Sequence, residues 1–480
     1  MSTSPAVRRR PLLHLTAPHG WLNDPHAVAH LGGHYHLFYQ HNPHGVDWAV
    51  GIHWGHATAP DLVGWVDRGD VLAPDDQDGG CWSGGMAVKD GEATLLYTSV
   101  QTENPSLGSV RLAHPSPSAL VWSKDPVGAV IGPQAGDLDL LDLRDPYPWW
   151  TGREWLLVQG AGVSGLGGAV VQYRSPDLRD WSYDGVVVSS ATAAGLTSTA
   201  DGSLRPDGSP WWSREMWECP QLFALDGSWV LLLSVGHRHR PADIVYAVGD
   251  YDGSRFTPRY WGPFSHGPAA YAVTAFVDAQ GRRCAMSWLR ERTETRPTEW
   301  AGCLSLPVLL TLDGDRLVTA PHPDLAKYRQ PGQALGEDPV TVDLVSGAAE
   351  FLVPPPGAPL SLRVADEAGV ELVHLDAAAD VVRLRVAGSE PLELTRSAAG
   401  APPDRDLPLS LMMDADVVEV CGGGTEGMVA VRLSTYPQRV TVWTSGVATV
   451  YPVATVSPVV PAEPRAQPGS ASWPEGNRPR

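Results

Sequence analysis

The stretch Trp21-Leu22-Asn23-Asp24-Pro25, with the segment that follows it, decides the fold of this chain. A short apolar run leads to Gly33, and a second apolar run, His34-Tyr35-His36-Leu37-Phe38-Tyr39, comes directly after that glycine. Two such runs joined by a glycine predict a β-hairpin, because glycine adopts turn conformations that other residues avoid.

The same arrangement recurs along the chain at a nearly constant spacing. Four more glycines join pairs of apolar runs, and the steps between the five glycines are 58, 61, 75 and 54 residues: Gly91, Gly152, Gly227 and Gly281. A second repeat has the same period, since three prolines each precede a tryptophan by five residues: Pro60 and Trp65, Pro117 and Trp122, Pro176 and Trp181. Five repeats of this kind predict a five-bladed β-propeller with long connecting loops, in which each blade buries its apolar face against its neighbours.

Acidic residues precede three of these glycines. Asp24, Asp145 and Glu218 lie nine, seven and nine residues before their glycines, and Trp82-Ser83 and Tyr271-Ala272 occupy the matching places in the other two repeats. A propeller brings matching positions together around one central mouth, so this ring offers carboxylates and aromatic walls suited to a sugar. Asp-Pro and Glu-Cys-Pro could also be turns at strand entries, but recurrence of an acid in three repeats favours a functional site.

Composition agrees with an all-β chain of two domains. The 480 residues are too many for one ordinary core, and they include 50 Gly, 44 Pro and 19 Trp but no stretch typical of a long amphipathic helix. The net charge of −19 disfavours binding to nucleic acid or to anionic membrane surfaces. No run of about 18 apolar residues is present, so no membrane span is expected.

The N-terminus and the cysteines favour a cytoplasmic location. Arg8-Arg9-Arg10 is not followed by an apolar core of the kind found in a secretory signal. The five cysteines are odd in number and form no CxxC pair, which fits reduced, buried thiols. Nine histidines fall between His19 and His56 and leave a metal site open, but no acidic or cysteine partners accompany them, so no metal or cofactor is expected.

Proline- and glycine-rich stretches and a change in the strand pattern predict four segments. The catalytic propeller is expected over residues 15–323, a linker containing Pro331-Gly332 over 324–338, a β-sandwich over 339–456, and a disordered, proline-rich tail over 457–480. Short alternating runs predict the strands of the sandwich, for example at residues 360–364, 381–386 and 439–443.

At these residues the chain resembles glycoside hydrolase family 32, the β-fructofuranosidases that include invertases and levanases. The resemblance covers about residues 15–440, and its motifs occur in family order: Trp21 to Pro25, Phe38 to Pro43, Trp54 to Thr58, Trp82 to Gly84, Arg144 to Pro146, Glu218 to Pro220, Trp300 to Pro307 and Val417 to Cys421. It implies a five-bladed propeller followed by a β-sandwich, as the repeats predict.

The resemblance also implies roles for individual residues. Asp24 would be the nucleophile, Glu218 the general acid/base and Asp145 a stabiliser of the transition state. The fructosyl unit would be bound by six more residues: Asn23, Gln40, Trp48, Trp82, Ser83 and Arg144. We include Cys219 and His26 among the substrate-binding residues because they adjoin Glu218 and the Asp24 motif, although Cys219 could be a small packing residue and His26 could point into its blade.

The chemistry of fructosyl transfer calls for such a set of acids. An oxocarbenium-like transition state needs a nearby carboxylate, and a retaining enzyme uses one carboxyl group as nucleophile and the other as proton donor. Three close acids cannot all stay ionised at low cost, so one is expected to hold a proton, and we assign that role to Glu218. The family usually continues Asn-Asp-Pro with Asn-Gly, where this chain has His26-Ala27, so its leaving group is open.

The sequence therefore predicts a retaining β-fructofuranosidase that acts on sucrose or fructo-oligosaccharides. Three alternatives stay open: a fructosyltransferase that uses the same site with a sugar acceptor, a non-catalytic sugar-binding propeller, and an inverting, arabinan-type propeller enzyme. No nucleic-acid or membrane partner is expected, and the sequence does not specify the oligomeric state.

Overall fold

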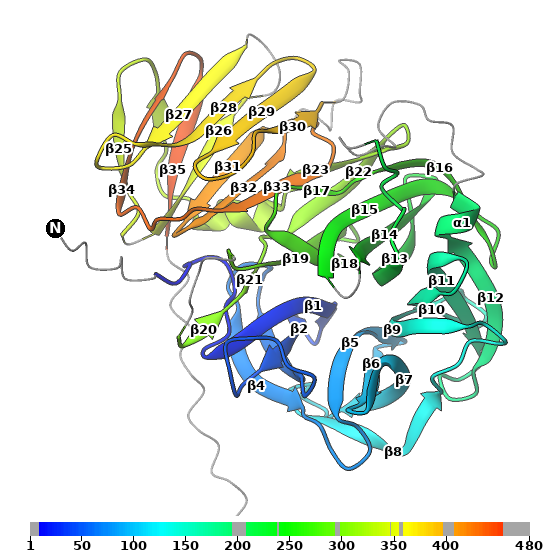
Figure 1. Ribbon diagram of the computed structural model, residues 1–480. Coiled ribbons are helices and arrows are strands. Elements are labelled where there is room, and N and C mark those ends of the chain that lie inside the picture. Colours follow the sequence, from blue (N-terminus) through cyan, green and yellow to red (C-terminus); the bar gives the residue numbers. More distant parts are fainter. Residues whose placement is uncertain are drawn as a thin grey trace, which may run out of the picture.

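The computed structural model describes residues 9–193, 208–237, 240–292, 298–345, 347–354, 359–396 and 408–454, and these are almost entirely β. Their only helical segments are the four-residue helix α1 (Ser190–Ala193) and the 3-10 helix η1 (Pro323–Tyr328). No helix in these ranges is long and apolar enough to cross a membrane. Figure 1 shows the wheel of the propeller viewed near its axis, with the sandwich packed against one side.

Twenty strands form five antiparallel groups of four, and consecutive strands pair within each group. The first two groups are β1 (Gly20–Leu31), β2 (His34–Asn42), β3 (His53–Ala59) and β4 (Val66–Leu72), then β5 (Gly80–Lys89), β6 (Glu92–Gln101), β7 (Asn104–Pro115) and β8 (Trp122–Ile131). The third and fourth are β9 (Leu140–Trp150), β10 (Trp155–Val163), β11 (Gly167–Ser175) and β12 (Ser182–Ser189), then β13 (Met216–Leu225), β14 (Ser228–His237), β15 (Arg240–Tyr251) and β16 (Phe256–Pro263). The fifth is β18 (Ala270–Val277), β19 (Arg283–Leu289), β22 (Val308–Asp313) and β23 (Arg316–Pro321).

The five groups close into a ring. Their first strands, β1, β5, β9, β13 and β18, contact one another in that order, and β18 contacts β1 (Figure 1). Two short strands from one segment strengthen the junction: β20 (Trp300–Ala301) pairs in parallel with β1, and β21 (Cys303–Leu304) pairs with β19. The all-β propeller that the repeats predicted is therefore present, with its blades arranged around one axis.

The repeat glycines lie where the sequence placed them. Gly33, Gly91, Gly152, Gly227 and Gly281 each lie between the first and second strands of a blade, and their φ angles fall between 80° and 93°. An L side chain is disfavoured at such angles, so glycine is the residue that lets each inner hairpin turn tightly.

Large side chains fill the spaces between blades. Trp54 lies between the first and second blades, and Trp217 and Trp261 lie between the third and fourth, all three with 0% exposure. Burying an apolar side chain of this size contributes roughly 1.5–3 kcal/mol. The contacts that hold one blade against the next therefore also fix the strands that carry the central ring.

The second domain is a sandwich of two sheets around one apolar core. One sheet has the order β17 (Ser265–His266), β33 (Met428–Arg432), β32 (Val417–Gly422), β31 (Leu409–Asp414), β26 (Gly347–Val353), β35 (Ala448–Ala454) and β24 (Gln333–Leu335). The other has the order β25 (Val340–Asp343), β34 (Arg439–Thr444), β27 (Leu360–Ala365), β28 (Glu371–Ala377), β29 (Val381–Val386) and β30 (Leu392–Thr395).

Three features tie the domains together. The propeller segment β17 extends the sandwich sheet by pairing with β33. His14 lies between two buried sandwich acids, with Nδ1 2.7 Å from Asp414 and Nε2 3.2 Å from Glu419. The segment expected to be a linker contains most of η1 and also β24, which pairs with β35, so it packs as part of the structure. The tail predicted over 457–480 lies outside the described residues.

Candidate active site

In every blade the innermost strand carries a β-bulge, and these bulges build the site. The residues that these bulges leave out of register are Asn23 and Asp24, Ser83, Asp145 and Pro146, Cys219 and Pro220, and Ala272 and Val273. The last paired residues before the bulges are Leu22, Trp82, Arg144, Glu218 and Tyr271. A bulge bends its strand and redirects side chains, so residues in and beside the bulges reach the same end of the propeller axis.

The register corrects one detail of the sequence-based interpretation. Asp24 and Asp145 lie inside their bulges, whereas Glu218 is the last paired residue before its bulge. Side chains on a regular strand alternate between faces, so this offset would separate the acids on an undistorted sheet. The bulges let all three reach one cavity.

This cavity has a volume of about 590 Å³, within the range of small-molecule sites. All three acids line it, as do five of the predicted binding residues: Asn23, Gln40, Trp48, Trp82 and Arg144. Seven lining residues were not predicted as site residues: Trp21, Val50, Pro105, Ser106, Pro241, Tyr271 and Trp288. Of these, Tyr271 was recognisable as the fifth member of the repeat, and Trp21 lies in the motif of Asp24. The other five come from a loop (Val50), a second strand (Trp288) and third strands (Pro105, Ser106 and Pro241), which the repeat does not mark.

Asp24 is held by a closed set of hydrogen bonds. Asn23 donates to its Oδ1 at 2.9 Å, and Ser83 Oγ donates to its Oδ2 at 2.7 Å. Gln40 completes the set, because its Oε1 accepts from Asn23 at 2.8 Å and its Nε2 donates to Ser83 Oγ. Burial raises the pKa of Asp24 to about 6, although the hydrogen bonds from Ser83 and Asn23 oppose the rise.

Asp145 is fixed by the neighbouring blade. Its Oδ2 accepts from the backbone N–H of Cys219 at 2.8 Å and lies 3.6 Å from the Cys219 Sγ. Burial raises the pKa of Asp145 to about 7, while the positive charge of Arg144 lowers it and the charge of Glu218 raises it further. Asp145 also has a left-handed φ of 63°, which is uncommon for a residue other than glycine and is typical of functional sites.

Glu218 is more accessible than Asp145, with 25% of its side chain exposed. The Tyr271 hydroxyl donates to its Oε2, and Arg144 Nε lies 3.4 Å from its Oε1. Arg144 also lies over the Trp82 ring at 5.4 Å and donates to Asp142 at 2.8 Å. Each acid is therefore bonded by the next blade along the chain: Asp24 by Ser83, Asp145 by Cys219, and Glu218 by Tyr271.

Three predicted binding residues lie behind the cavity wall. Ser83 and Cys219 do not line the cavity; they contact Asp24 and Asp145 instead. The prediction that His26 binds substrate is wrong, because His26 points into its blade, where the centre of its ring lies 3.9 Å from that of Trp54. Burial lowers the pKa of His26 to about 3, and neither ring nitrogen has a hydrogen-bond partner in the described structure. Although His26 follows the Asp24 motif directly in sequence, its side chain does not reach the leaving-group side of the cavity.

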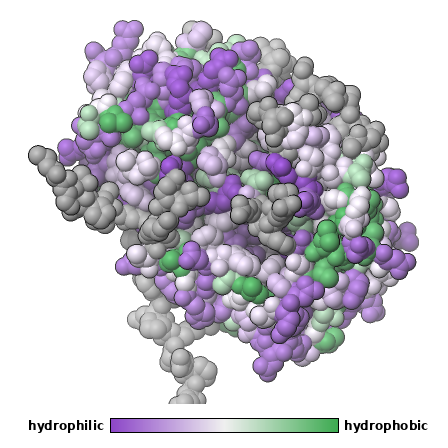
Figure 2. All heavy atoms as spheres, in the orientation of Figure 1, coloured by the Kyte–Doolittle hydropathy of each residue, from purple (hydrophilic) through white to green (hydrophobic). Residues whose placement is uncertain are grey.

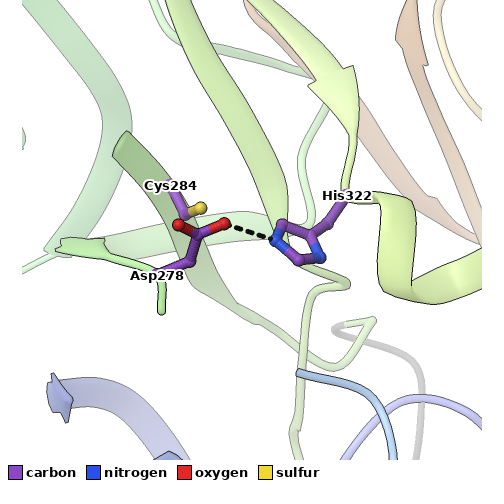
Figure 3. Close-up of side chains that lie close together, drawn as sticks. All are labelled: Asp278, Cys284 and His322. Carbon is purple, nitrogen blue, oxygen red and sulfur yellow. Dashed lines mark hydrogen bonds and ion pairs between the residues drawn. The ribbon is translucent and has the colours of Figure 1, made fainter. Parts of the chain in front are cut away.

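One cluster of possible metal ligands lies away from this cavity, at Asp278, Cys284 and His322 (Figure 3). Its groups already have partners: Asp278 Oδ2 accepts from Arg282 Nε at 2.6 Å and lies 3.1 Å from His322 Nε2, while His322 Nδ1 accepts from the backbone N–H of Asp324. A guanidinium bonded to the carboxylate disfavours a cation at the same oxygen, so this cluster fits a structural network better than a metal site.

The lining of the cavity suits a neutral, polar ring compound. Trp48 and Trp82 meet edge to face at 5.4 Å on one side, and Trp21 and Trp288 do so at 5.4 Å on another. Aromatic faces pack against C–H groups, and the acids accept hydrogen bonds from hydroxyls. Hydrophilic residues cover much of the face of the molecule in Figure 2, with hydrophobic patches between them.

Comparison with known proteins shows similarity over most of the propeller. Residues 14–321 match the glycosyl hydrolases family 32 N-terminal domain. The chain is 27% identical over 347 residues to a sucrose-6-phosphate hydrolase of Escherichia coli, covering 68% of this chain and 67% of the relative. It is 30% identical over 344 residues to a raffinose invertase of Escherichia coli, covering 68% and 67%. The matched parts thus span about two thirds of these relatives.

The fold also matches a solved structure. A mutant of a Bombyx mori GH32 β-fructofuranosidase, in complex with sucrose, superimposes with a TM-score of 0.75 at 24% identity, covering 93% of this chain and 94% of that one. This likeness establishes the arrangement of a propeller with a sandwich.

Proposed function

Because the chain belongs to glycoside hydrolase family 32 and is a glycoside hydrolase for β-fructofuranosyl bonds, we propose that it works by retention, with Asp24 as nucleophile and Glu218 as general acid/base. One observation carries the proposal: Asp24 and Glu218, from strands far apart in sequence, line one cavity of about 590 Å³ together with Asp145. A non-catalytic sugar-binding propeller would need no such set of acids.

The first step forms a fructosyl-enzyme. An Asp24 carboxylate oxygen bonds to the anomeric carbon, the bond from that carbon to the leaving oxygen breaks, and the proton of the Glu218 carboxyl passes to the leaving oxygen. In the second step a water oxygen attacks the same carbon while Glu218 takes the water proton, and the ester bond to Asp24 breaks. The two inversions give net retention and restore both acids.

Asp24 is prepared to attack by its surroundings. The hydrogen bonds from Asn23 and Ser83 favour the anionic form, while burial makes that anion costly. A desolvated carboxylate that is held in place loses little freedom on attack. Glu218 has 25% of its side chain exposed, which suits a group that exchanges its proton with water in each cycle.

Asp145 and Arg144 are proposed to hold the fructosyl hydroxyls. Asp145 accepts a hydrogen bond from the backbone N–H of Cys219, the residue after Glu218, and Arg144 contacts Glu218 and lies over the Trp82 ring. Hydrogen bonds from sugar hydroxyls to a carboxylate strengthen as positive charge develops at the anomeric carbon. The proposed substrates are sucrose and fructo-oligosaccharides.

We also propose that the reaction takes place in the cytoplasm. All five cysteines are free, buried thiols, which suits a reducing compartment. Fractionation of the source cells tests this proposal, and recovery of the activity outside the cytoplasm would contradict it.

A substrate panel tests the function. Purified protein is given sucrose, sucrose-6-phosphate, inulin and levan, and the products are identified by chromatography and by the configuration of the released fructose. Release of β-fructofuranose first supports retention. Asp24→Ala and Glu218→Ala should abolish turnover, whereas Asp67→Asn, a buried acid bonded to Tyr39 away from the cavity, should keep it. Full turnover in Asp24→Ala would refute the assignment.

A further inference from the structure

Thr98 on β6 joins two of the bulges that carry the site, yet it does not line the cavity. Its side chain has 0% exposure, and its hydroxyl makes two bonds at once. Oγ1 donates to the carbonyl of Ser83 at 2.7 Å and accepts from the backbone N–H of Asp145 at 2.9 Å. One buried hydroxyl thus links the second blade to the third at the level of the acids.

The Asp145 end of this link is under strain. Asp145 has a φ of 63° in its bulge, a conformation that costs roughly 1–2 kcal/mol for a residue with a side chain. The bulge also removes the Asp145 N–H from the regular strand ladder. A buried N–H without a partner costs about 1–3 kcal/mol, so the Thr98 hydroxyl stabilises the conformation that aims the carboxylate.

The Ser83 end leads to the nucleophile. The carbonyl of Ser83 is bonded to Thr98, and the hydroxyl of the same residue donates to Asp24 Oδ2 at 2.7 Å. Thr98 therefore acts on Asp24 through one residue and on Asp145 through its backbone. The Cys219 Sγ also lies near both carboxylates, 3.9 Å from Asp24 Oδ2 and 3.6 Å from Asp145 Oδ2.

The orientation of Thr98 is fixed by packing. A Cβ on Gly108 of β7 would lie 2.3 Å from the Thr98 methyl carbon, so glycine leaves the space that this methyl occupies. With the methyl held there, the hydroxyl faces Ser83 and Asp145. β-Branched side chains have few rotamers, which keeps the hydroxyl in that direction.

We propose that Thr98 is a positioning residue that sets the placement of Asp145 relative to Asp24, so that turnover depends on a hydroxyl that never touches the sugar. The inference rests on the proposed function of this site. A misplacement of about 1 Å can cost on the order of 100-fold in rate.

The test compares two substitutions. Thr98→Val keeps the shape and removes the hydroxyl, and Thr98→Ser keeps the hydroxyl and removes the methyl. With sucrose or the best substrate of the panel, Thr98→Val should lower kcat about 10-fold to 100-fold with KM within about threefold, while Thr98→Ser should stay within about threefold of wild type in kcat. If Thr98→Val does not fold, Thr98→Ala takes its place, assayed well below its own Tm.

A matched control separates positioning from stability. Thr319 is also buried, and its Oγ1 donates to the Gly427 carbonyl at 2.6 Å, away from the cavity. Thr319→Val should lower Tm and leave kcat unchanged. Wild-type kcat in Thr98→Val, or equal losses in Thr98→Ser and Thr98→Val, would overturn the proposal.

Crystal structures distinguish a failure of the positioning role of Thr98 from a failure of the proposed enzymatic function. Absence of turnover by the wild type would count against the proposed function alone. The inference is then decided by crystal structures of wild type and Thr98→Val: Asp145 should leave its left-handed conformation in the variant, and an unchanged Asp145 would overturn the inference.

Discussion

The backbone N–H of Cys219 donates a 2.8 Å hydrogen bond to Oδ2 of Asp145, which joins the innermost strands of two neighbouring blades at the site. Ser83 bonds Asp24 in the same sense, and Tyr271 bonds Glu218. Because each acid is held by the following blade, the packing between blades and the geometry of the acids are one property of the molecule. Changes at these contacts should therefore alter rate and pH dependence as well as stability.

Loss of the Asp145 charge should stabilise the protein at alkaline pH. Burial raises the pKa of Asp145 to about 7, from an unfolded value of 3.8, so the folded protein binds the proton of this carboxyl more tightly than the unfolded chain does. The stability that this proton contributes is fully present below pH 3.8 and is lost as the pH rises through about 7. Asp145→Asn keeps a carbonyl to accept from Cys219 and carries no charge. Its Tm should exceed that of wild type by a few degrees at about pH 8, with a smaller difference at about pH 4.5. Scanning calorimetry at both pH values measures this, and an equal difference at both would contradict it.

Removal of the Ser83 hydroxyl should impair the nucleophile. Its bond lowers the pKa of Asp24, which burial holds at about 6, so Ser83→Ala should move the acid limb of kcat/KM to higher pH. Activity falls below this limb because protonated Asp24 cannot attack. A lost bond to a charged group should also lower kcat by about 10-fold or more. The control is Ser234→Ala, a buried serine whose hydroxyl has no described partner, and its pH profile should match wild type.

His14 should stabilise the protein in a defined pH window. Burial lowers its pKa, but the charge of Glu419 and the contacts with Asp414 outweigh burial and raise the pKa to about 9. This contribution is fully present below the unfolded value of 6.5 and is lost as pH rises through about 9. His14→Gln should lower Tm clearly at about pH 6, since breaking a buried pair costs roughly 3–5 kcal/mol, and less at about pH 9.5.

The control for His14 is a histidine at the surface. His114, 42% exposed, pairs with Asp125 at 2.9 Å, and His114→Gln should change Tm little at either pH because exposed pairs contribute little. A loss in His14→Gln that is constant from neutral to alkaline pH would show that packing, and not charge, accounts for it.

His26 should act on stability and not on substrate binding. Its ring packs on Trp54, and both nitrogens are buried without a described partner. His26→Ala should lower Tm by leaving a cavity, whereas His26→Leu should keep Tm near wild type because it fills the space and removes an unsatisfied polar group. KM for the best substrate should stay within about twofold in both variants. A large change in KM for His26→Leu would contradict this prediction and would indicate that His26 contributes to substrate binding.

The sequence was sufficient to predict the blades and the central acids. The glycines from Gly33 to Gly281 mark the inner hairpins because a tight turn needs their positive φ, and this requirement shows in a single sequence. The acids near them could be grouped because a propeller brings the corresponding segment of every blade to one axis. Family motifs added Gln40 and Trp48, which also line the cavity.

The rest depends on contacts that leave no local pattern. The β-bulges shift register by one residue, so the offset of Glu218 from Asp145 could not be read from distances to a glycine. The direction of His26 follows from the side of the strand that faces Trp54. The link from Thr98 to Asp145 joins residues from two blades, and only the packed structure brings them together.

Covalent trapping is the decisive test of Asp24 as the nucleophile. Glu218→Gln is mixed with p-nitrophenyl β-fructofuranoside, whose leaving group needs little help from an acid, so that the second step becomes slow. The protein is then quenched in acid, digested and analysed by mass spectrometry. We expect an added fructosyl unit on the peptide that contains Asp24. In the double variant Asp24→Asn, Glu218→Gln, treated in the same way, no fructosyl unit should be found on that peptide. A fructosyl unit on another residue, or release of the phenol with inverted fructose and no adduct, would contradict it.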